Sequence, residues 1–216
     1  MVQSQHRLLR EVFEIESVYA VVGLSMGGMQ TFEWAIAYPG FAKKTIAAIA
    51  SPRLPSYDIA LWNTRNTLLG LYRNCQCKEA LNAIAVVNML SNEPSKLSED
   101  VKRNQAVSTI ESRGEAYTMT IGESWYVQRQ AEAMISHNIA RDFDDDMEKA
   151  AIKTGTEFLI VVGDDDRVVT PQPARNFATL VDATLVELDE DCGHGDPWCA
   201  PDAFSKAVRS FIAEEN

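Results

Sequence analysis

Residues 18–29 read Val-Tyr-Ala-Val-Val-Gly-Leu-Ser-Met-Gly-Gly-Met, a β-branched run followed by a glycine-flanked serine. The run Val18–Val22 predicts a buried strand, and the apolar spacing of Met26–Tyr38 predicts a helix. Between them, Gly23–Gly27 matches G-x-S-x-G, in which small flanking residues allow a sharp strand-to-helix turn. The pattern predicts Ser25 as a nucleophile at the top of a parallel sheet.

The same turn offers an oxyanion donor. Because the helix starts directly after Ser25, the backbone N–H of Met26 lies at the helix N-terminus, where it can stabilise negative charge. The sequence thus predicts a nucleophile and one oxyanion donor in adjacent residues. The alternative is a glycine-rich turn without chemistry.

Short apolar strands alternate with helices outside one long segment. Further strands are predicted at Thr45–Ala50, Glu157–Val162 and Thr184–Leu188, and helices at residues 3–13 and Pro201–Ala213. Such alternation implies an α/β fold class, a parallel sheet with helices on both faces.

Residues 55–154 have a different character. Clusters of β-branched residues are few there, and helical periodicity recurs at Leu68–Tyr72, Ala80–Leu90, Val101–Ile110 and Trp125–Ile135. A proline and a serine predict a turn over Asn92–Ser98. We therefore expect a helical lid over residues 55–154, inserted into a core formed by residues 1–54 and 155–216.

The general base is expected late in the chain. A serine hydroxyl is a weak nucleophile and needs such a base, and G-x-S-x-G enzymes place serine, acid and histidine in that order. Two histidines follow Ser25. His194 lies in a loop just after the fourth predicted strand, whereas His137 falls inside the helical insert and is predicted to pack or face solvent. His194 is therefore the predicted base.

The acid is expected directly after the third strand. Three aspartates, Asp164, Asp165 and Asp166, follow Gly163. Asp166 is the predicted acid, because the usual order there is glycine, two variable residues, aspartate and a nearby proline, here Pro171. Its carboxylate would fix the imidazole tautomer and stabilise the imidazolium. The other two aspartates remain alternatives.

Charge and hydropathy exclude two classes of partner. The net charge is −11, from 20 basic and 31 acidic residues, and no basic cluster stands out, so nucleic-acid binding is not expected. No apolar run reaches the roughly 18–20 residues of a membrane span, and Met1–Arg10 does not resemble a signal peptide. The sequence predicts a soluble, cytoplasmic protein without membrane partners.

Four cysteines and three histidines bear on redox and metal chemistry. Cys75 and Cys77 are too close to suggest a framework disulfide, and four cysteines, with Cys192 and Cys199, are few for a secreted scaffold. The spaced ligand pairs of a zinc site are missing. We predict free thiols in a reducing compartment, no metal site and no bound cofactor.

The nucleophile region resembles a known family. Residues 21–30 (Val-Val-Gly-Leu-Ser-Met-Gly-Gly-Met-Gln), followed by Glu33-Trp34-Ala35 and Tyr38-Pro39, closely resemble the same region of homoserine O-acetyltransferases. Gln5–Leu9 resembles the helix before it, and the resemblance is strongest over residues 1–52. It implies an α/β-hydrolase-type parallel sheet, with about four strands present here, and an inserted helical lid.

The resemblance also implies a chemistry. It implies an acyl-enzyme on Ser25, formed from acetyl-CoA as co-substrate, with transfer to the hydroxyl of homoserine. Carried over by position, Asp166 is the acid and His194 the base. One departure concerns the acceptor: family acyltransferases have an aspartate directly after the histidine, but here Gly195 precedes Asp196.

A second departure lies in the insert. The family's lid signature is not found near Leu61–Tyr72, although suitable residue types occur there. We therefore predict an esterase for small acyl esters, with an acetyl-CoA-dependent homoserine O-acetyltransferase as the alternative and a truncated, non-catalytic α/β module as the second. The predicted substrate-binding residues are Trp62, Arg65, Tyr72, Trp125 and Asp196. For the aromatic ones, and for Tyr126, the alternative is packing inside the lid.

Two expectations follow from the family's full length. Family members carry several strands and an oxyanion loop before the nucleophile, so we expect the N-terminal part of the fold to be missing here. The strand Tyr19–Val22 would then lie at an open sheet edge. An exposed apolar face of the lid predicts a homodimer.

Overall fold

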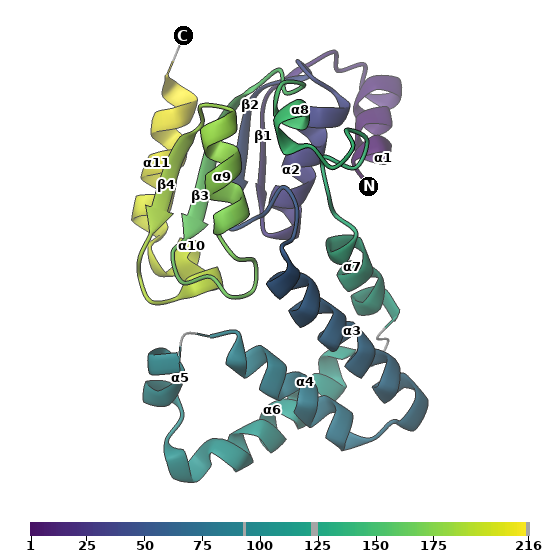
Figure 1. Cartoon of the computed structure of the whole chain (residues 1–216), viewed down its shortest axis with the longest axis vertical. Coiled ribbons are helices and arrows are strands. Elements are labelled where there is room, and N and C mark those ends of the chain that lie inside the picture. The colour runs from purple at the N-terminus through teal and green to yellow at the C-terminus, as the bar shows by residue number, and fades with distance from the viewer. Residues whose placement is uncertain (93, 122–124, 215–216) are drawn as a thin grey trace.

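The computed structural model describes residues 1–92, 94–121 and 125–214, and a parallel sheet lies at its centre (Figure 1). Four strands are hydrogen-bonded in the order β1-β2-β3-β4, all parallel. Their bounds are Val18–Leu24, Ala42–Ala48, Glu157–Gly163 and Thr184–Leu188. The predicted α/β class is confirmed, and the fourth strand has the bounds that its sequence predicted.

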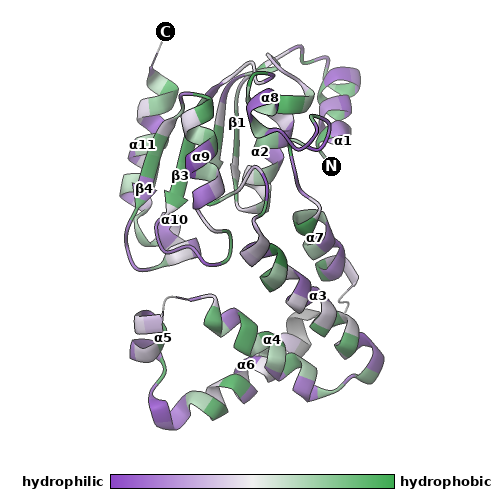
Figure 2. Cartoon of the chain, viewed as in Figure 1, coloured by the Kyte–Doolittle hydropathy of each residue, from purple (hydrophilic) through white to green (hydrophobic). Residues whose placement is uncertain are grey.

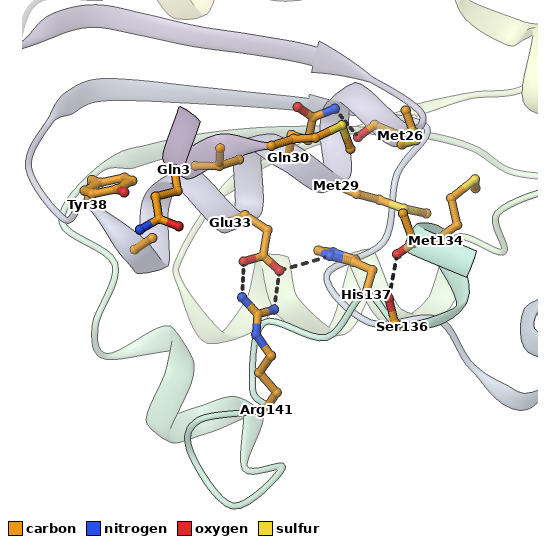
Figure 3. Close-up of a pocket in the computed structure, with 14 residues that line it drawn as sticks. Gln3, Met26, Met29, Gln30, Glu33, Tyr38, Met134, Ser136, His137 and Arg141 are labelled. Atoms are coloured by element: carbon orange, nitrogen blue, oxygen red, sulfur yellow. Dashed lines mark hydrogen bonds and ion pairs between the residues drawn. The ribbon is translucent and has the colours of Figure 1, made fainter. Parts of the chain in front are cut away.

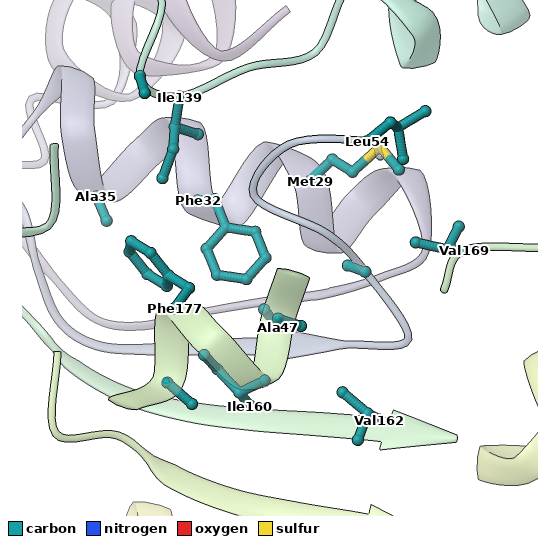
Figure 4. Packing of buried hydrophobic residues seen from close by; sticks show 14 of the residues in the cluster. Met29, Phe32, Ala35, Ala47, Leu54, Ile139, Ile160, Val162, Val169 and Phe177 are labelled. Atoms are coloured by element: carbon teal, nitrogen blue, oxygen red, sulfur yellow. The ribbon is translucent and has the colours of Figure 1, made fainter. Parts of the chain in front are cut away.

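Alternate residues of the central strands build two cores, one on each face of the sheet. Ile160 and Val162 of β3 pack with Phe32 and Phe177, from α2 (Met26–Ala37) and α9 (Gln172–Leu180) (Figure 4). The intervening Val161 packs on the opposite face, where α11 (Pro201–Ala213) contributes its own apolar residues. Figure 2 shows β3 as mostly hydrophobic, as a strand buried on both faces requires.

The strand that precedes Ser25 lies at the sheet edge. Within the described residues β1 pairs only with β2, and Tyr19 and Val22 of β1 are 46% and 50% exposed. This confirms the expected open edge. Before β1, α1 (Val2–Arg7) continues into a π-helix (Leu8–Val12), close to the single helix predicted over residues 3–13.

Most of the insert is helical and extends away from the sheet, but its last helix, Met147–Ala151, lies beside the sheet and packs into the core (Figure 1). Its described elements are α3 (Ser56–Cys75), α4 (Lys78–Leu90), α5 (Pro94–Asp100), a 3-10 turn (Arg103–Gln105), α6 (Ala106–Ile121), α7 (Trp125–Ile135) and α8 (Met147–Ala151). Helix α3 packs against both α4 and α7, and α4 packs against α6. That this segment acts as a lid stays a prediction.

Two predictions within the insert are wrong. The expected turn at Asn92–Ser98 is largely α5, because Pro94 occupies the first helical position, where its fixed φ suits a helix. The expected helix at Val101–Ile110 starts later: Val101 and Lys102 are not helical, the 3-10 turn follows, and α6 begins only at Ala106.

The prediction of free thiols is also wrong. Cys75 is bonded to Cys77, and Cys192 to Cys199. The first pair meets because Gln76 adopts a left-handed conformation (φ 52°), which brings the two Cα atoms to 5.0 Å. The second pair meets because the chain turns back through the short helix α10 (Asp196–Cys199). No described helix is both long and apolar enough to span a membrane.

Candidate active site

Ser25 lies on the predicted turn between β1 and α2. Its backbone has φ 52° and ψ −123°, a region that a non-glycine residue occupies only under strain. A Cβ at Gly23 would collide with the backbone of Gly27, so the turn requires glycine there. Gly27 itself faces open space, so its small size is not what lets the backbone turn.

His194 joins the serine to the predicted acid. Its Nε2 lies 2.9 Å from Ser25 Oγ, and its Nδ1 lies 2.7 Å from Asp166 Oδ2. The Asp166 side chain is fully buried and that of His194 is 22% exposed. The structure therefore brings the three predicted residues into one hydrogen-bonded series, in the arrangement that a nucleophile, a base and an orienting acid require.

The loop that carries Asp166 is held by the aspartate itself. In this acid loop, residues 164–171 between β3 and α9, Asp166 Oδ1 accepts the N–H groups of Val168 at 2.8 Å and Val169 at 3.0 Å. Because these two bonds use Oδ1, the other carboxylate oxygen, Oδ2, is available to the imidazole of His194. Asp164 instead forms an ion pair with Arg175. Of the three candidate aspartates, Asp166 is the one that reaches His194.

Met26, the predicted oxyanion donor, is the first residue of α2. Backbone N–H groups in the first turn of a helix have no carbonyl partner within that helix, and the helix dipole favours negative charge at this end. The position fits the predicted role, which stays a prediction.

Two predicted substrate residues, Trp62 and Arg65, lie on α3. Trp62 is buried, and its Nε1 donates a hydrogen bond to Val168 O at 3.0 Å. The Arg65 guanidinium lies 4.7 Å from the centre of the Trp62 ring. Burial lowers the pKa of Arg65 against a raising effect of Tyr117. Trp62 therefore contacts the acid loop directly, whereas Arg65 packs against Trp62.

The other three predicted substrate residues are elsewhere. Tyr72 packs inside the insert with Leu69 and Ile84, and Trp125, at 58% exposure, faces solvent. Asp196 is buried, and its Oδ1 accepts the N–H of Cys192 at 3.0 Å. It therefore supports the loop that carries the base, which sequence reasoning did not foresee.

His137 lies apart from the three-residue series. Its Nδ1 is 3.1 Å from Glu33 Oε1, and Arg141 binds both oxygens of the same carboxylate (Figure 3). Burial alone would raise the pKa of Glu33, but hydrogen bonds from Arg141 and His137 outweigh it and lower that pKa to about 2. These side chains line a cavity of about 620 Å³ beside α2, which also includes Met26. His137 is thus a packed histidine, as expected.

Asp58 was not singled out in the sequence. It lies in the first turn of α3, is fully buried, and accepts the N–H of Thr170 at 3.0 Å through Oδ2. Burial raises its pKa to about 6, the Asp166 charge adds to this, and Thr170 and His194 oppose it. An acidic residue in a first helical turn is ordinary, so the sequence held no signal of this contact.

One group of side chains has the spacing of a cation site. Carboxylate oxygens of Asp165, Asp189 and Asp191 all lie within 4.8 Å of one another. The last two residues are exposed, and such clusters are common on acidic surfaces without an ion. Among the described residues, nothing else at this place points to a metal.

Known structures identify the fold. Homoserine O-acetyltransferase from Bacillus anthracis superposes with a TM-score of 0.81, at 18% identity over 99% of this chain and 64% of that one. An α/β-hydrolase enzyme from a deep-sea metagenome library superposes with a TM-score of 0.68, at 18% identity over 100% and 71%. The chain therefore has the α/β-hydrolase fold.

Sequence comparison points to the same kind of protein. The chain is 24% identical to homoserine O-succinyltransferase of Acinetobacter baylyi over 96% of its length. It is also 49% identical to ethyl acetate hydrolase of Pseudomonas veronii, over 57 residues that make up 26% of this chain and 16% of that protein. No family model matches. The similarities support a homoserine O-acyltransferase-like α/β-hydrolase. The chain spans about 61% of the length of the Acinetobacter protein.

Proposed function

We propose that this protein is a serine hydrolase that cleaves small acyl esters through an acyl-enzyme on Ser25. The observation that carries the proposal is the position of His194, within hydrogen-bond distance of both Ser25 Oγ and Asp166 Oδ2. Asp166 holds the imidazole so that Nδ1–H faces its carboxylate and Nε2 is free to accept the serine proton.

The reaction then follows from these positions. Ser25 Oγ attacks the ester carbonyl while His194 Nε2 takes its proton, and the tetrahedral oxyanion forms near the Met26 N–H. Collapse of the intermediate breaks the ester bond, and the leaving alcohol takes the proton from His194. Water then attacks the acyl-enzyme by the same route, which releases the acid and restores Ser25.

Acyl transfer is the alternative. In that reaction acetyl-CoA acylates Ser25, and the hydroxyl of homoserine replaces water in the second half. The similar proteins named above include both acyltransferases and an ester hydrolase. Hydrolysis is favoured here because Asp196, the predicted acceptor contact, is buried against Cys192 and not presented to a substrate. Acetyl-CoA would be a co-substrate only in this alternative.

Product analysis separates the two reactions. The full chain is incubated with p-nitrophenyl acetate in water, and separately with acetyl-CoA and homoserine, and the products are identified by mass spectrometry. The proposal predicts acetate from the ester and no O-acetylhomoserine. Ser25→Ala should abolish turnover, and Ser205→Ala, a matched change on α11, should not. O-acetylhomoserine formed faster than acetate would establish the alternative. If neither the ester nor the acetyl-CoA and homoserine pair reacts, the result would favour the non-catalytic module.

We also propose a homodimer that forms through the insert. Exposed apolar side chains on the insert support a homodimer through this segment; they are Tyr57, Ile59, Leu71, Leu90, Val107 and Trp125. Light scattering at micromolar concentration tests this, and a monomer would contradict it. The cytoplasmic location stays a prediction, and the two disulfides weigh against it, because such bonds are rare in reducing compartments.

A further inference from the structure

Helix α3 is hydrogen-bonded to the acid loop at two points. Asp58 accepts the N–H of Thr170 at 3.0 Å, and Trp62, one turn further along, donates to the carbonyl of Val168 at 3.0 Å. Residues four apart lie on the same face of a helix. A single face of α3 therefore holds two sites in the loop that carries Asp166.

The two carboxylates share the backbone of that loop. Asp166 Oδ1 accepts the N–H groups of Val168 and Val169, and Asp58 Oδ2 accepts that of Thr170, the next residue. Three consecutive backbone donors are thus bound by two aspartates. Any shift of the Thr170 backbone away from Asp58 would be transmitted to the donors that hold Asp166.

Burial and the nearby charge of Asp166 make an ionised Asp58 energetically unfavourable. Its side chain is fully buried, and Oδ1 has no hydrogen-bond partner among the described residues. The titratable groups that face it are the like-charged Asp166, which disfavours its ionised form, and His194, which favours it. A buried carboxylate with a free oxygen beside another carboxylate usually lowers stability. A role in the site accounts for its presence.

We propose that Asp58 is a positioning residue: by binding the Thr170 N–H from α3, it fixes the acid loop so that Asp166 stays aligned with His194. The inference rests on the proposed function, since the alignment matters only if His194 serves Ser25. The hydrogen bond between Asp58 and Thr170 also connects the insert to the site, because α3 is the first helix of the insert.

Two variants of Asp58 distinguish its role as a hydrogen-bond acceptor from an effect of its charge. Asp58→Ala removes the acceptor, and we expect kcat for p-nitrophenyl acetate to fall about 10-fold or more with KM nearly unchanged, because misplacing a catalytic group acts on the reaction step. Asp58→Asn retains an amide oxygen for Thr170 and should keep kcat within about 3-fold of the wild type. Glu157→Gln is the matched control. It loses a carboxylate paired with Lys44 at the first residue of β3, the opposite end of the strand from the acid loop, and should lower Tm without changing kcat.

Amide hydrogen exchange provides a readout that needs no turnover. In Asp58→Ala we expect faster exchange at Thr170 and also at Val168 and Val169, whose donors bind Asp166, whereas Asp58→Asn should protect all three. If the wild type hydrolyses no ester, the proposed function fails, while the exchange pattern still tests the coupling within the loop.

Each failure has a distinct signature. A folded Asp58→Ala with wild-type kcat would overturn the inference, and so would faster exchange confined to Thr170. Asp58→Asn as slow as Asp58→Ala would also overturn it, because the charge and not the acceptor would then be what matters. If Asp58→Ala does not fold, Trp62→Phe weakens the same grip at Val168; unchanged kcat and exchange in that variant would contradict the proposal.

Discussion

The imidazole Nδ1 of His194 lies 2.7 Å from Oδ2 of Asp166, a distance at which the carboxylate fixes both the tautomer and the orientation of the ring. Asp166→Asn leaves the volume unchanged but can present an N–H to the imidazole. We expect kcat to fall about 10⁴-fold, the loss known for the same change in another serine enzyme. Steady-state kinetics with p-nitrophenyl acetate measure it. Asp164→Asn is the control, since Asp164 pairs with Arg175, and an equal loss there would contradict the assignment of the acid.

Asp58 makes stability depend on pH with an unusual sign. Its pKa is raised, chiefly by burial, from 3.8 to about 6, so the folded state holds this proton more tightly than the unfolded state. The wild type should lose stability as pH rises from about 4 to above 6, whereas Asp58→Asn should not. The free energy of unfolding of Asp58→Asn relative to wild type should therefore grow by about 2–3 kcal/mol between pH 4 and pH 8.

Urea unfolding at the two pH values measures this difference. Glu157→Gln again provides the comparison, because that carboxylate is paired with Lys44 and not isolated in the interior. Parallel pH profiles for Asp58→Asn and the wild type would show that Asp58 ionises normally.

Glu33 should act in the opposite direction. Burial raises its pKa, but hydrogen bonds from Arg141 and His137 dominate and lower it from 4.5 to about 2. The stability that this carboxylate provides is present above about pH 4.5 and is lost as pH falls towards 2. The destabilisation caused by Glu33→Gln should thus be smaller at pH 3 than at pH 7, by about 2 kcal/mol. A pH-independent difference in unfolding free energy would contradict the network.

The Cys192–Cys199 disulfide closes the segment that contains His194. Replacing both cysteines by serine should lower the free energy of unfolding by about 2–3 kcal/mol, the loop-closure value for a short segment. It should also lower kcat, because the base loses a constraint. The matched control replaces Cys75 and Cys77, which lie at the far end of α3. Equal kcat values for the two double variants would show that the bond does not support the base.

Local patterns predicted the sheet and the three-residue series well. The turn around Ser25 is local, because its glycines, strand and helix are contiguous in the sequence. The positions of Asp166 and His194 followed from the chain order serine, acid, histidine of G-x-S-x-G enzymes and from the loops that follow the third and fourth predicted strands. The open edge at β1 followed from the resemblance to a longer family, whose further strands would lie beside it.

Contacts between distant parts of the chain could not be predicted from the sequence. Asp58 and Thr170 are 112 residues apart, and Trp62 and Val168 are 106 apart. No spacing rule connects such pairs. The disulfide at Cys75 was missed because the prediction considered separation along the chain, whereas the left-handed Gln76 sets the distance in space. Asp196 was assigned to substrate binding by resemblance, although burial gives it a supporting role.

Covalent labelling of the full chain with a fluorophosphonate tests the central claim most directly, because it reports an activated serine for any acyl substrate. Mass spectrometry of the digested protein locates the adduct. The account predicts one adduct on the peptide that contains Ser25, absent in Ser25→Ala and much slower to form in His194→Ala. A folded wild-type protein that stays unlabelled, or one labelled at another serine, would contradict it.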